Sequence, residues 1–259
     1  MFGLFHKNKT FPTFEPLVTD MHCHLLPLVD DGSKSLEESL EVMEAMKATG
    51  FSQIRITPHF QCPRFPNTEA EIKEKFSNFC EEVRTNGVGK ELPELSGISG
   101  EYRIDDGFED HVKKGGMLTY HFADPEKGSE KGLLLVEFSL HQQRMGLEEA
   151  IFTCQMEGYD VIVAHPERYP YLDAHSSFLS NLKEQGVYFQ VNIPSLDGFY
   201  GEPAQRKAFE FIQNGWVEFL GTDMHNIMYA QALRHASANK KIIKLLSTTE
   251  FLNSQLVVK

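Results

Sequence analysis

Short apolar stretches alternate along this chain with longer segments whose apolar residues recur every three or four positions. Residues 133–136 form a continuous apolar run, as expected for a strand that is buried on both faces of a parallel sheet. Residues 51–57 alternate apolar and polar side chains, which is typical of a strand. Residues 36–49 follow a capping-box pattern, carry Leu and Met at helical spacing and end at Gly50, which predicts a helix.

The same patterns predict strands and helices in strict alternation. The predicted strands cover residues 17–21, 51–57, 95–100, 133–136, 161–164, 187–192 and 216–220. The predicted helices cover residues 36–49, 68–83, 147–156, 178–184 and 203–215, and a helical tail follows from residue 230. We expect an arm over residues 1–16, and a short helix and a long loop within residues 102–131. Seven strand–helix units with histidines on the first strand favour a parallel, closed or nearly closed barrel, as a single domain over residues 1–259.

The charge and composition exclude several classes of protein. Acidic residues outnumber basic ones by 37 to 25, giving a net charge of −12, which argues against nucleic acid as a partner. No apolar run approaches the roughly 18 residues of a membrane span, so we expect no membrane insertion. The 4 cysteines show neither CxxC spacing nor a disulfide framework, and no secretory signal is visible. These features predict a cytoplasmic protein.

Carboxylate and imidazole side chains stand at the ends of most of the predicted strands. In an extended strand Asp20, His22 and His24 project to one face, so two imidazoles form a metal clamp and Asp20 is placed behind them to orient the rings. An isolated His-x-His is about as often a hydrogen-bonding pair in a half-buried strand. The further groups favour a metal, because the carboxyl ends of barrel strands meet at one face. The strand-end residues are His22, His24, His59, Glu101, Glu137, His165, Asp223 and His225.

This set of donors suits two or three cations better than one. Carboxylate and imidazole are ligands of zinc, manganese and iron, and a tetrahedral ion takes only four of them. Glu101 or Glu137 is the natural bridge, because a carboxylate has two oxygens. Two ions about 3.5–4 Å apart can clamp the oxygens of an in-line displacement and lower the pKa of bound water to about 7. Arg168 follows His165 closely and offers a planar fork for phosphate, although alone it would as readily be a surface ion pair.

The motifs of this chain resemble those of the PHP (polymerase and histidinol phosphatase) family, specifically the bacterial manganese-dependent protein-tyrosine phosphatases of the CpsB/YwqE type. The motifs are Asp20-Met21-His22-Cys23-His24-Leu25-Leu26-Pro27, Asp30-Asp31-Gly32, Thr57-Pro58-His59, Ala164-His165-Pro166-Glu167-Arg168 and Thr222-Asp223-Met224-His225-Asn226. The resemblance implies an α/β fold, a distorted (β/α)7 TIM-like barrel of the PHP type, with a three-metal site for Mn²⁺, or for Fe or Zn. It also implies hydrolysis of phosphotyrosine on the tail of a bacterial tyrosine autokinase that controls capsular and exopolysaccharide biosynthesis.

The resemblance further implies the role of each residue in the site. The ligand sets would be His22, His24, Glu101 and Asp223 for one ion, Glu137 and His165 with Glu101 bridging for a second, and Asp31, His59 and His225 for the third. Arg168 would bind the phosphate, and Arg168, His59 and Asp31 are the expected catalytic residues.

Two points of this resemblance are open. The choice of Asp31 over the adjacent Asp30 comes from the family alone. The family often has a second arginine shortly after the Asp-x-His pair, where this chain has Ala230, with Arg234 further on. The source of a second phosphate contact is therefore unassigned by the sequence.

Other functions are compatible with the same residues. The same metals would serve a small phosphate ester such as histidinol phosphate. An amidohydrolase-type deaminase or amidase also begins with His-x-His on a barrel strand, but such sites often use a carboxylated lysine where this chain has Glu101 and Glu137. An inactive barrel that binds a kinase tail is a further alternative. The loop aromatics, which would flank an aromatic substrate or pack as a lid, are Phe60, Phe65, Tyr102, Phe199 and Tyr200.

Overall fold

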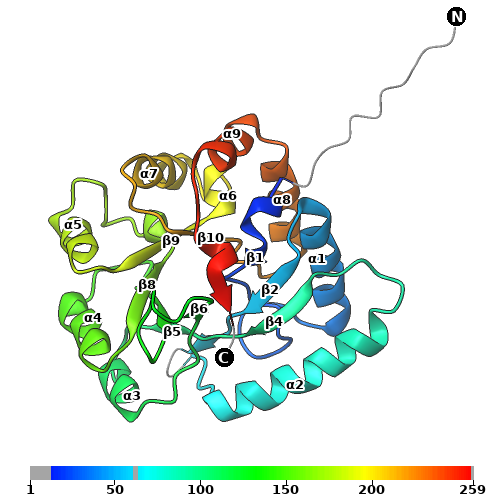
Figure 1. Cartoon of the computed structure of the whole chain (residues 1–259), viewed down its shortest axis with the longest axis horizontal. Coiled ribbons are helices and arrows are strands. Elements are labelled where there is room, and N and C mark those ends of the chain that lie inside the picture. Colours follow the sequence, from blue (N-terminus) through cyan, green and yellow to red (C-terminus); the bar gives the residue numbers. More distant parts are fainter. Residues whose placement is uncertain (1–12, 61–63, 258–259) are drawn as a thin grey trace, which may run out of the picture.

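Parallel strands lie in the middle of the molecule and helices surround them (Figure 1). The computed structural model describes residues 13–60 and 64–257. The strands are β1 Thr19–Asp20, β2 Gln53–Ile56, β3 His59–Phe60, β4 Glu94–Ile98, β5 Glu101–Arg103, β6 His121–Phe122, β7 Leu133–Glu137, β8 Asp160–Ala164, β9 Tyr188–Asn192, β10 Phe219–Gly221 and β11 Leu256–Val257. The α-helices are α1 Leu36–Thr49, α2 Glu69–Asn86, α3 Phe108–Lys114, α4 Leu147–Met156, α5 Ser177–Glu184, α6 Ile193–Leu196, α7 Glu202–Gln213, α8 Ile227–Ser237 and α9 Lys240–Thr248, and short 3-10 helices lie at Glu15–Leu17, Pro166–Arg168 and Asn253–Gln255.

The parallel strands form the wall of a barrel. One sheet has the order β1-β2-β4 and another the order β10-β9-β8-β7-β5-β3, with parallel pairing throughout. β2 is followed almost at once by β3, and β4 by β5, so each of these two stretches of chain passes from one sheet to the other. The first and last strands meet beyond their carboxyl ends, where the Asp223 amide donates to the His22 carbonyl at 2.8 Å and the His24 amide donates to the Met224 carbonyl at 2.8 Å. The predicted distorted (β/α)7 barrel is confirmed.

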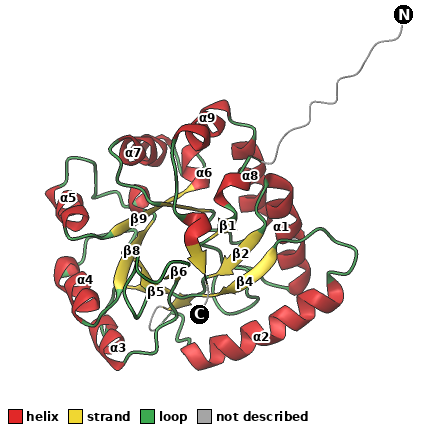
Figure 2. Cartoon of the chain, viewed as in Figure 1, coloured by secondary structure: helices red, strands yellow, loops and turns green. Residues whose placement is uncertain are grey.

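Local sequence explains where the first two long helices begin and end. The side chain of Ser35 accepts a hydrogen bond from the amide of Glu38 at 3.2 Å and so caps α1. Gly50 ends α1 with a φ of 120°, a conformation that L side chains rarely adopt. Thr68 and Glu71 form a reciprocal capping box at the start of α2. Figure 2 shows both helices packed outside the strands.

The end of the chain differs from the prediction. The tail was expected to be helical from residue 230, but α8 already begins at Ile227 and the helical part ends at Thr248. The chain then returns as β11, which pairs antiparallel with β6 from within residues 102–131. Leu256 of β11 is buried in a cluster with Phe122 of β6, and burial against so distant a segment leaves no periodic signal in the local sequence. The short helix expected within residues 102–131 is α3, whereas β6 and α6 were not predicted.

Several sequence predictions concern the cysteines, the arm and membranes. Residues 1–12 of the predicted arm and Cys62 lie outside the described residues. Cys23, Cys80 and Cys154 carry no disulfide, and Cys23 is buried in the core. In the described part of the chain, no helix combines the length and the apolar character needed to cross a bilayer.

Candidate metal centre

The carboxyl ends of the barrel strands meet at one mouth, and the acidic and imidazole residues singled out above lie there. His22 and His24 follow β1, and Asp223 and His225 follow β10. Glu101 is the first residue of β5 and Glu137 is the last residue of β7. Short contacts connect every member of the set to at least one other. The residues brought together are His22, His24, Asp31, His59, Glu101, Glu137, His165, Asp223 and His225.

Glu101 lies at the centre of this cluster. Its Oε2 is 3.2, 3.3 and 3.0 Å from ring nitrogens of His22, His24 and His59. Its Oε1 is 3.4 Å from Nε2 of His165. The side chain is fully buried, and among the described residues neither oxygen has a hydrogen-bond partner. A buried carboxylate without hydrogen bonds, enclosed by imidazole nitrogens, fits ligands gathered around cations better than a hydrogen-bonded core.

His22 and His24 form the clamp that the His-x-His spacing predicted. Their Nε2 atoms are 3.2 Å apart and lie 3.6 and 3.5 Å from Oδ1 of Asp223. The far ring nitrogens are held by other side chains: Nδ1 of His22 lies 2.8 Å from Oε1 of Gln190, and Nδ1 of His24 lies 3.0 Å from Oδ2 of Asp30. Such bonds select the tautomer in which both Nε2 atoms carry lone pairs, as ligands of one ion would require.

Asp20 does not orient the rings, and that prediction is wrong. Its carboxylate accepts hydrogen bonds from the amide of Thr222 at 2.9 Å and from the Thr222 hydroxyl at 2.6 Å. The regular strand ends at Asp20, so the alternation that would place it behind the rings stops there. Burial raises the pKa of Asp20 to about 6. Asp20 therefore ties the first strand to the segment after the last one.

The adjacent aspartates of the Asp-Asp-Gly motif have different partners. Asp30 is buried and accepts from the His59 amide at 3.0 Å in addition to its bond with His24. Oδ1 of Asp31 instead lies 3.4 Å from Nε2 of His59 and 3.6 Å from Nε2 of His225. Asp31 therefore faces the imidazoles of His59 and His225 at the mouth, whereas Asp30 holds the His24 ring and the His59 backbone amide.

Opposite charges balance one another in the buried cluster. Burial disfavours the ionised form of Glu101, but the positive charges of His22 and His59 hold its pKa well below the usual range. Burial likewise disfavours the charged form of His59, but the neighbouring Glu101 carboxylate outweighs it and raises the pKa of His59 to about 9. Burial and the Glu101 charge together raise the pKa of Glu137. Cations would compensate the carboxylates in place of the imidazole protons.

Two residues of the cluster have a left-handed backbone. His165 has a φ of 36° and Asp223 a φ of 52°. Non-glycine residues adopt this region rarely, and such strain is concentrated at functional sites, where the surrounding structure holds it. The unusual φ falls directly after β8 at His165 and two residues after β10 at Asp223.

A cavity of about 270 Å³ adjoins the cluster. Six of the nine cluster residues line it, together with Leu140, Asn226, Tyr229 and three arginines, Arg64, Arg103 and Arg168. Nη1 of Arg168 donates to Oδ2 of Asp223 at 2.6 Å, and its guanidinium lies 4.2 Å from the centre of the Tyr200 ring. Arg234 is exposed on α8 and does not line the cavity.

The sequence analysis missed three residues of the site. Arg103 lies two positions after Glu101 in β5, so strand alternation could have placed both side chains on one face. Gln190 is a polar, fully buried residue that lies between Phe189 and Val191 in β9, which was a detectable signal. Arg64 lies in an irregular segment with no periodicity to indicate its direction.

Of the five aromatic residues expected in loops, Phe60 lies in β3 and Tyr102 in β5, whereas Phe65, Phe199 and Tyr200 lie outside the named strands and helices. Phe60 and Tyr102 are buried and stacked on each other with ring centres 4.6 Å apart, so they pack in the core. Phe65 stacks on His59 at 5.5 Å with nearly parallel rings, and Tyr200 lies beneath Arg168. Phe65 and Tyr200 thus contact side chains of the site.

Comparisons with known proteins agree on a family. A family model described as "Capsular polysaccharide synthesis, CpsB/CapC" matches residues 18–249. Over 209 residues the chain is 26% identical to tyrosine-protein phosphatase YwqE of Bacillus subtilis, covering 80% of this chain and 77% of the relative. It is 28% identical over 222 residues to tyrosine-protein phosphatase CpsB of Streptococcus pneumoniae, covering 80% and 83%.

Solved structures share the fold. One from a study of YwqE of Bacillus subtilis and CpsB of Streptococcus pneumoniae, described as metal-dependent tyrosine phosphatases, has a TM-score of 0.69 at 23% identity over 88% of this chain and 91% of that chain. A lactonase of Listeria monocytogenes has a TM-score of 0.54 at 12% identity, over 93% and 94%. At these identities the likeness shows the fold alone.

Proposed function

This chain belongs to the CpsB/CapC family of capsular polysaccharide synthesis, and from that premise we propose that it is a metal-dependent protein-tyrosine phosphatase. The names of the similar proteins YwqE and CpsB support this activity. The observation that carries the proposal is the buried Glu101 carboxylate, which has ring nitrogens of four histidines within 3.4 Å and no hydrogen bond among the described residues. Arg168 stands at the cavity beside it, as phosphate binding requires.

The proposed substrate is a phosphotyrosine protein, specifically the tail of a bacterial tyrosine autokinase, and its dephosphorylation would regulate capsular or exopolysaccharide biosynthesis. The family match to capsular polysaccharide synthesis supports this partner. We place the protein in the cytoplasm, and the free thiols of Cys23, Cys80 and Cys154 suit such a reducing compartment.

We propose a three-ion site for Mn²⁺, whose donors would also accept Fe or Zn. His22, His24, Asp223 and Glu101 would hold one ion, Glu137 and His165 with the bridging Glu101 a second, and Asp31, His59 and His225 the third. Four groups of three donor atoms lie within 4.8 Å of one another, and they are His24/His59/His225, His22/His24/Asp223, His22/Glu101/His165 and His59/Glu101/Glu137. These groups contain eight of the nine proposed donors, and the ninth, Asp31, contacts the set through His59 and His225.

The residues around the cavity would bind and orient the phosphate ester. Divalent cations held there would supply a water-derived nucleophile near neutral pH and stabilise negative charge on the phosphoryl group. Asp223 and Tyr200 hold the Arg168 guanidinium in place before the substrate arrives, so its remaining N–H groups can donate to phosphoryl oxygens at little entropic cost. His59 and Asp31, which we also assign as catalytic, face the same cavity. A tyrosine phenol has a pKa of about 10, so its phenolate leaves more readily than an alkoxide and needs less protonation.

The test is hydrolysis of p-nitrophenyl phosphate and of a phosphotyrosine peptide, with added Mn²⁺ and after chelation. We expect turnover of both only with metal, and its loss in His22→Ala but not in His141→Ala, which removes an exposed imidazole outside the cluster. A phosphoserine peptide and histidinol phosphate are assayed beside them. Turnover that survives chelation, or a preference for histidinol phosphate over the phosphotyrosine peptide, would overturn the proposed function.

A further inference from the structure

Each of the three arginines at the metal-site cavity touches one carboxylate of the cluster. The contacts are Arg64 Nη2 to Asp31 Oδ2 at 3.0 Å, Arg103 Nη1 to Glu137 Oε1 at 3.4 Å, and Arg168 Nη1 to Asp223 Oδ2 at 2.6 Å. A phosphate monoester that enters this cavity therefore meets guanidinium groups whose N–H donors are only partly occupied by these carboxylates.

Burial separates the three arginines. The side chain of Arg64 is 61% exposed, whereas those of Arg103 and Arg168 are 16% and 18% exposed. A mostly solvated guanidinium contributes little to binding, because water and salt screen it. The side chains of Arg103 and Arg168 are desolvated to a similar degree. Arg103 is therefore a stronger candidate than Arg64 for a second contact with phosphate.

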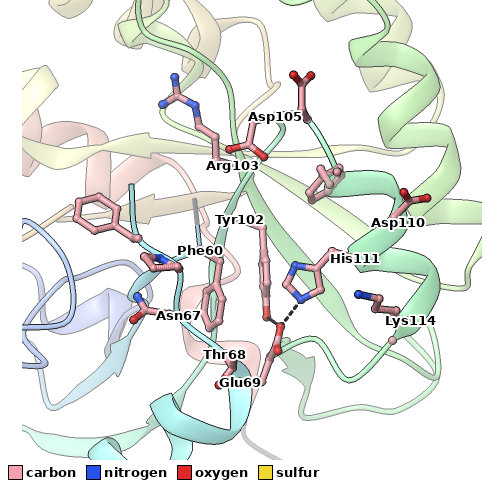
Figure 3. A pocket seen from close by; sticks show the side chains of 16 residues that line it. Phe60, Asn67, Thr68, Glu69, Tyr102, Arg103, Asp105, Asp110, His111 and Lys114 are labelled. Carbon is pink, nitrogen blue, oxygen red and sulfur yellow. Dashed lines mark hydrogen bonds and ion pairs between the residues drawn. The ribbon is translucent and has the colours of Figure 1, made fainter. Parts of the chain in front are cut away.

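Arg103 is mounted on a rigid part of the barrel. It lies in β5 two residues after Glu101, and Tyr102 between them points to the opposite side of the strand, as Figure 3 shows. The Tyr102 hydroxyl donates to Glu69 at 3.2 Å and accepts from the Leu118 amide at 2.8 Å, which anchors the strand at this point. The guanidinium of Arg103 is thus held at the boundary between the metal-site cavity and a second cavity of about 530 Å³.

The donors of Arg103 are loosely engaged. Its contact with Glu137 is 3.4 Å, longer than the 2.7–2.9 Å of a strong charge-assisted hydrogen bond. When Glu137 serves as a metal ligand, as proposed above, its charge is shared with the cation and its hold on Arg103 weakens. The planar fork of Arg103 then has N–H groups available to another anion in the cavity.

We propose that Arg103 is a second phosphate-binding residue, which donates to a phosphoryl oxygen of the substrate together with Arg168. This inference rests on the proposed function, because it assigns a substrate contact within the same site. The competing reading is that Arg103 only positions Glu137 and so supports the metal, which predicts a loss of manganese when Arg103 is replaced.

The experiment compares Arg103→Met and Arg103→Lys with the wild-type protein, all loaded with manganese. The matched control is Arg234→Met, which removes an exposed arginine that does not line the cavity. Isothermal titration with inorganic phosphate gives the dissociation constant, inhibition of p-nitrophenyl phosphate hydrolysis gives an independent value, and elemental analysis gives the manganese content.

We expect Arg103→Met to bind inorganic phosphate about 10- to 100-fold more weakly at an unchanged manganese content, the size of one lost charge-assisted hydrogen bond. Arg103→Lys should recover part of the loss and Arg234→Met should match the wild type. Phosphate affinity within twofold of the wild type, or a parallel fall in manganese content, would overturn the inference. A manganese-loaded wild type that binds phosphate but hydrolyses no aryl phosphate would refute the proposed function instead, and the phosphate titration would still decide the role of Arg103.

Discussion

Replacing Glu101 by glutamine tests the metal centre at the residue on which most of its contacts converge. The change keeps the size and shape of the side chain but removes its negative charge. Both oxygens of Glu101 are buried, and they lie 3.0–3.4 Å from ring nitrogens of four histidines. The amide of glutamine would bring N–H donors towards the bound cations, where they cannot act as ligands.

An order-of-magnitude figure for the effect follows from the charge that is removed. Two unit charges about 4 Å apart interact by about 4 kcal/mol at an effective dielectric of about 20. Because each factor of ten in an equilibrium constant is about 1.4 kcal/mol, this loss corresponds to roughly a thousandfold in metal affinity. A divalent cation interacts more strongly than a unit charge, and Glu101 is fully buried, so solvent screening does not reduce the figure.

The assay is manganese content by elemental analysis after dialysis, combined with a manganese titration of p-nitrophenyl phosphate turnover. Glu167→Gln is the matched control, because Glu167 is equally buried but accepts hydrogen bonds from the Asn192 amide and the Ser195 hydroxyl outside the cluster. We expect Glu101→Gln to lose metal and turnover while Glu167→Gln retains its manganese. A Glu101→Gln protein with wild-type manganese content, and half-saturation within threefold of the wild type, would refute the reasoning.

Three further predictions concern the support of the site. Gln190→Leu removes the bond that orients His22, and we expect manganese affinity to fall about 10- to 100-fold in the same titration, with unaltered affinity counting against this role. Gly32→Ala would place a Cβ 2.0 Å from the His24 carbonyl oxygen, so urea unfolding should show a loss of about 1–3 kcal/mol, and wild-type stability would contradict the clash. Burial raises the pKa of Asp105 from 3.8 to about 6, so the folded protein holds a proton there that the unfolded chain has lost. The free energy of unfolding of the wild type, relative to that of Asp105→Asn, should therefore fall as the pH rises from 3.8 to about 6. A difference in unfolding free energy that does not change with pH would exclude the raised pKa of Asp105.

The sequence predicted the barrel because its signals are local. The continuous apolar run of β7 and the capped helix α1 both follow from periodicity and end residues within a few turns of chain. The two-residue pairing of β6 with β11 was missed, because a short strand acquires its partner from a distant segment and carries no period of its own. The same limit applies to α6, a single turn that follows directly on β9.

The candidate site shows the same division between local and distant determinants. Strand ends deliver their side chains to one mouth in any parallel barrel, so the placement of Glu101, Glu137 and His165 could be predicted once the strands were recognised. The hydrogen-bond partners of the site's side chains could not be predicted, because each ring nitrogen bonds to whichever group the folded chain places beside it. Spacing indicated Asp20 as the group that orients the histidines, whereas packing assigned that role to Gln190 and Asp30.

The amino-acid sequence by itself determined which acidic and imidazole side chains stand at the strand ends around the mouth of this barrel, since strand ends are properties of the backbone over a few residues. Only the tertiary structure decided how those side chains meet. It enclosed the Glu101 carboxylate among four imidazoles, gave His165 and Asp223 left-handed backbones and placed Arg103 beside Glu137. Distances of 3–4 Å between groups from separate strands depend on how the whole barrel closes, and no local pattern carries that information.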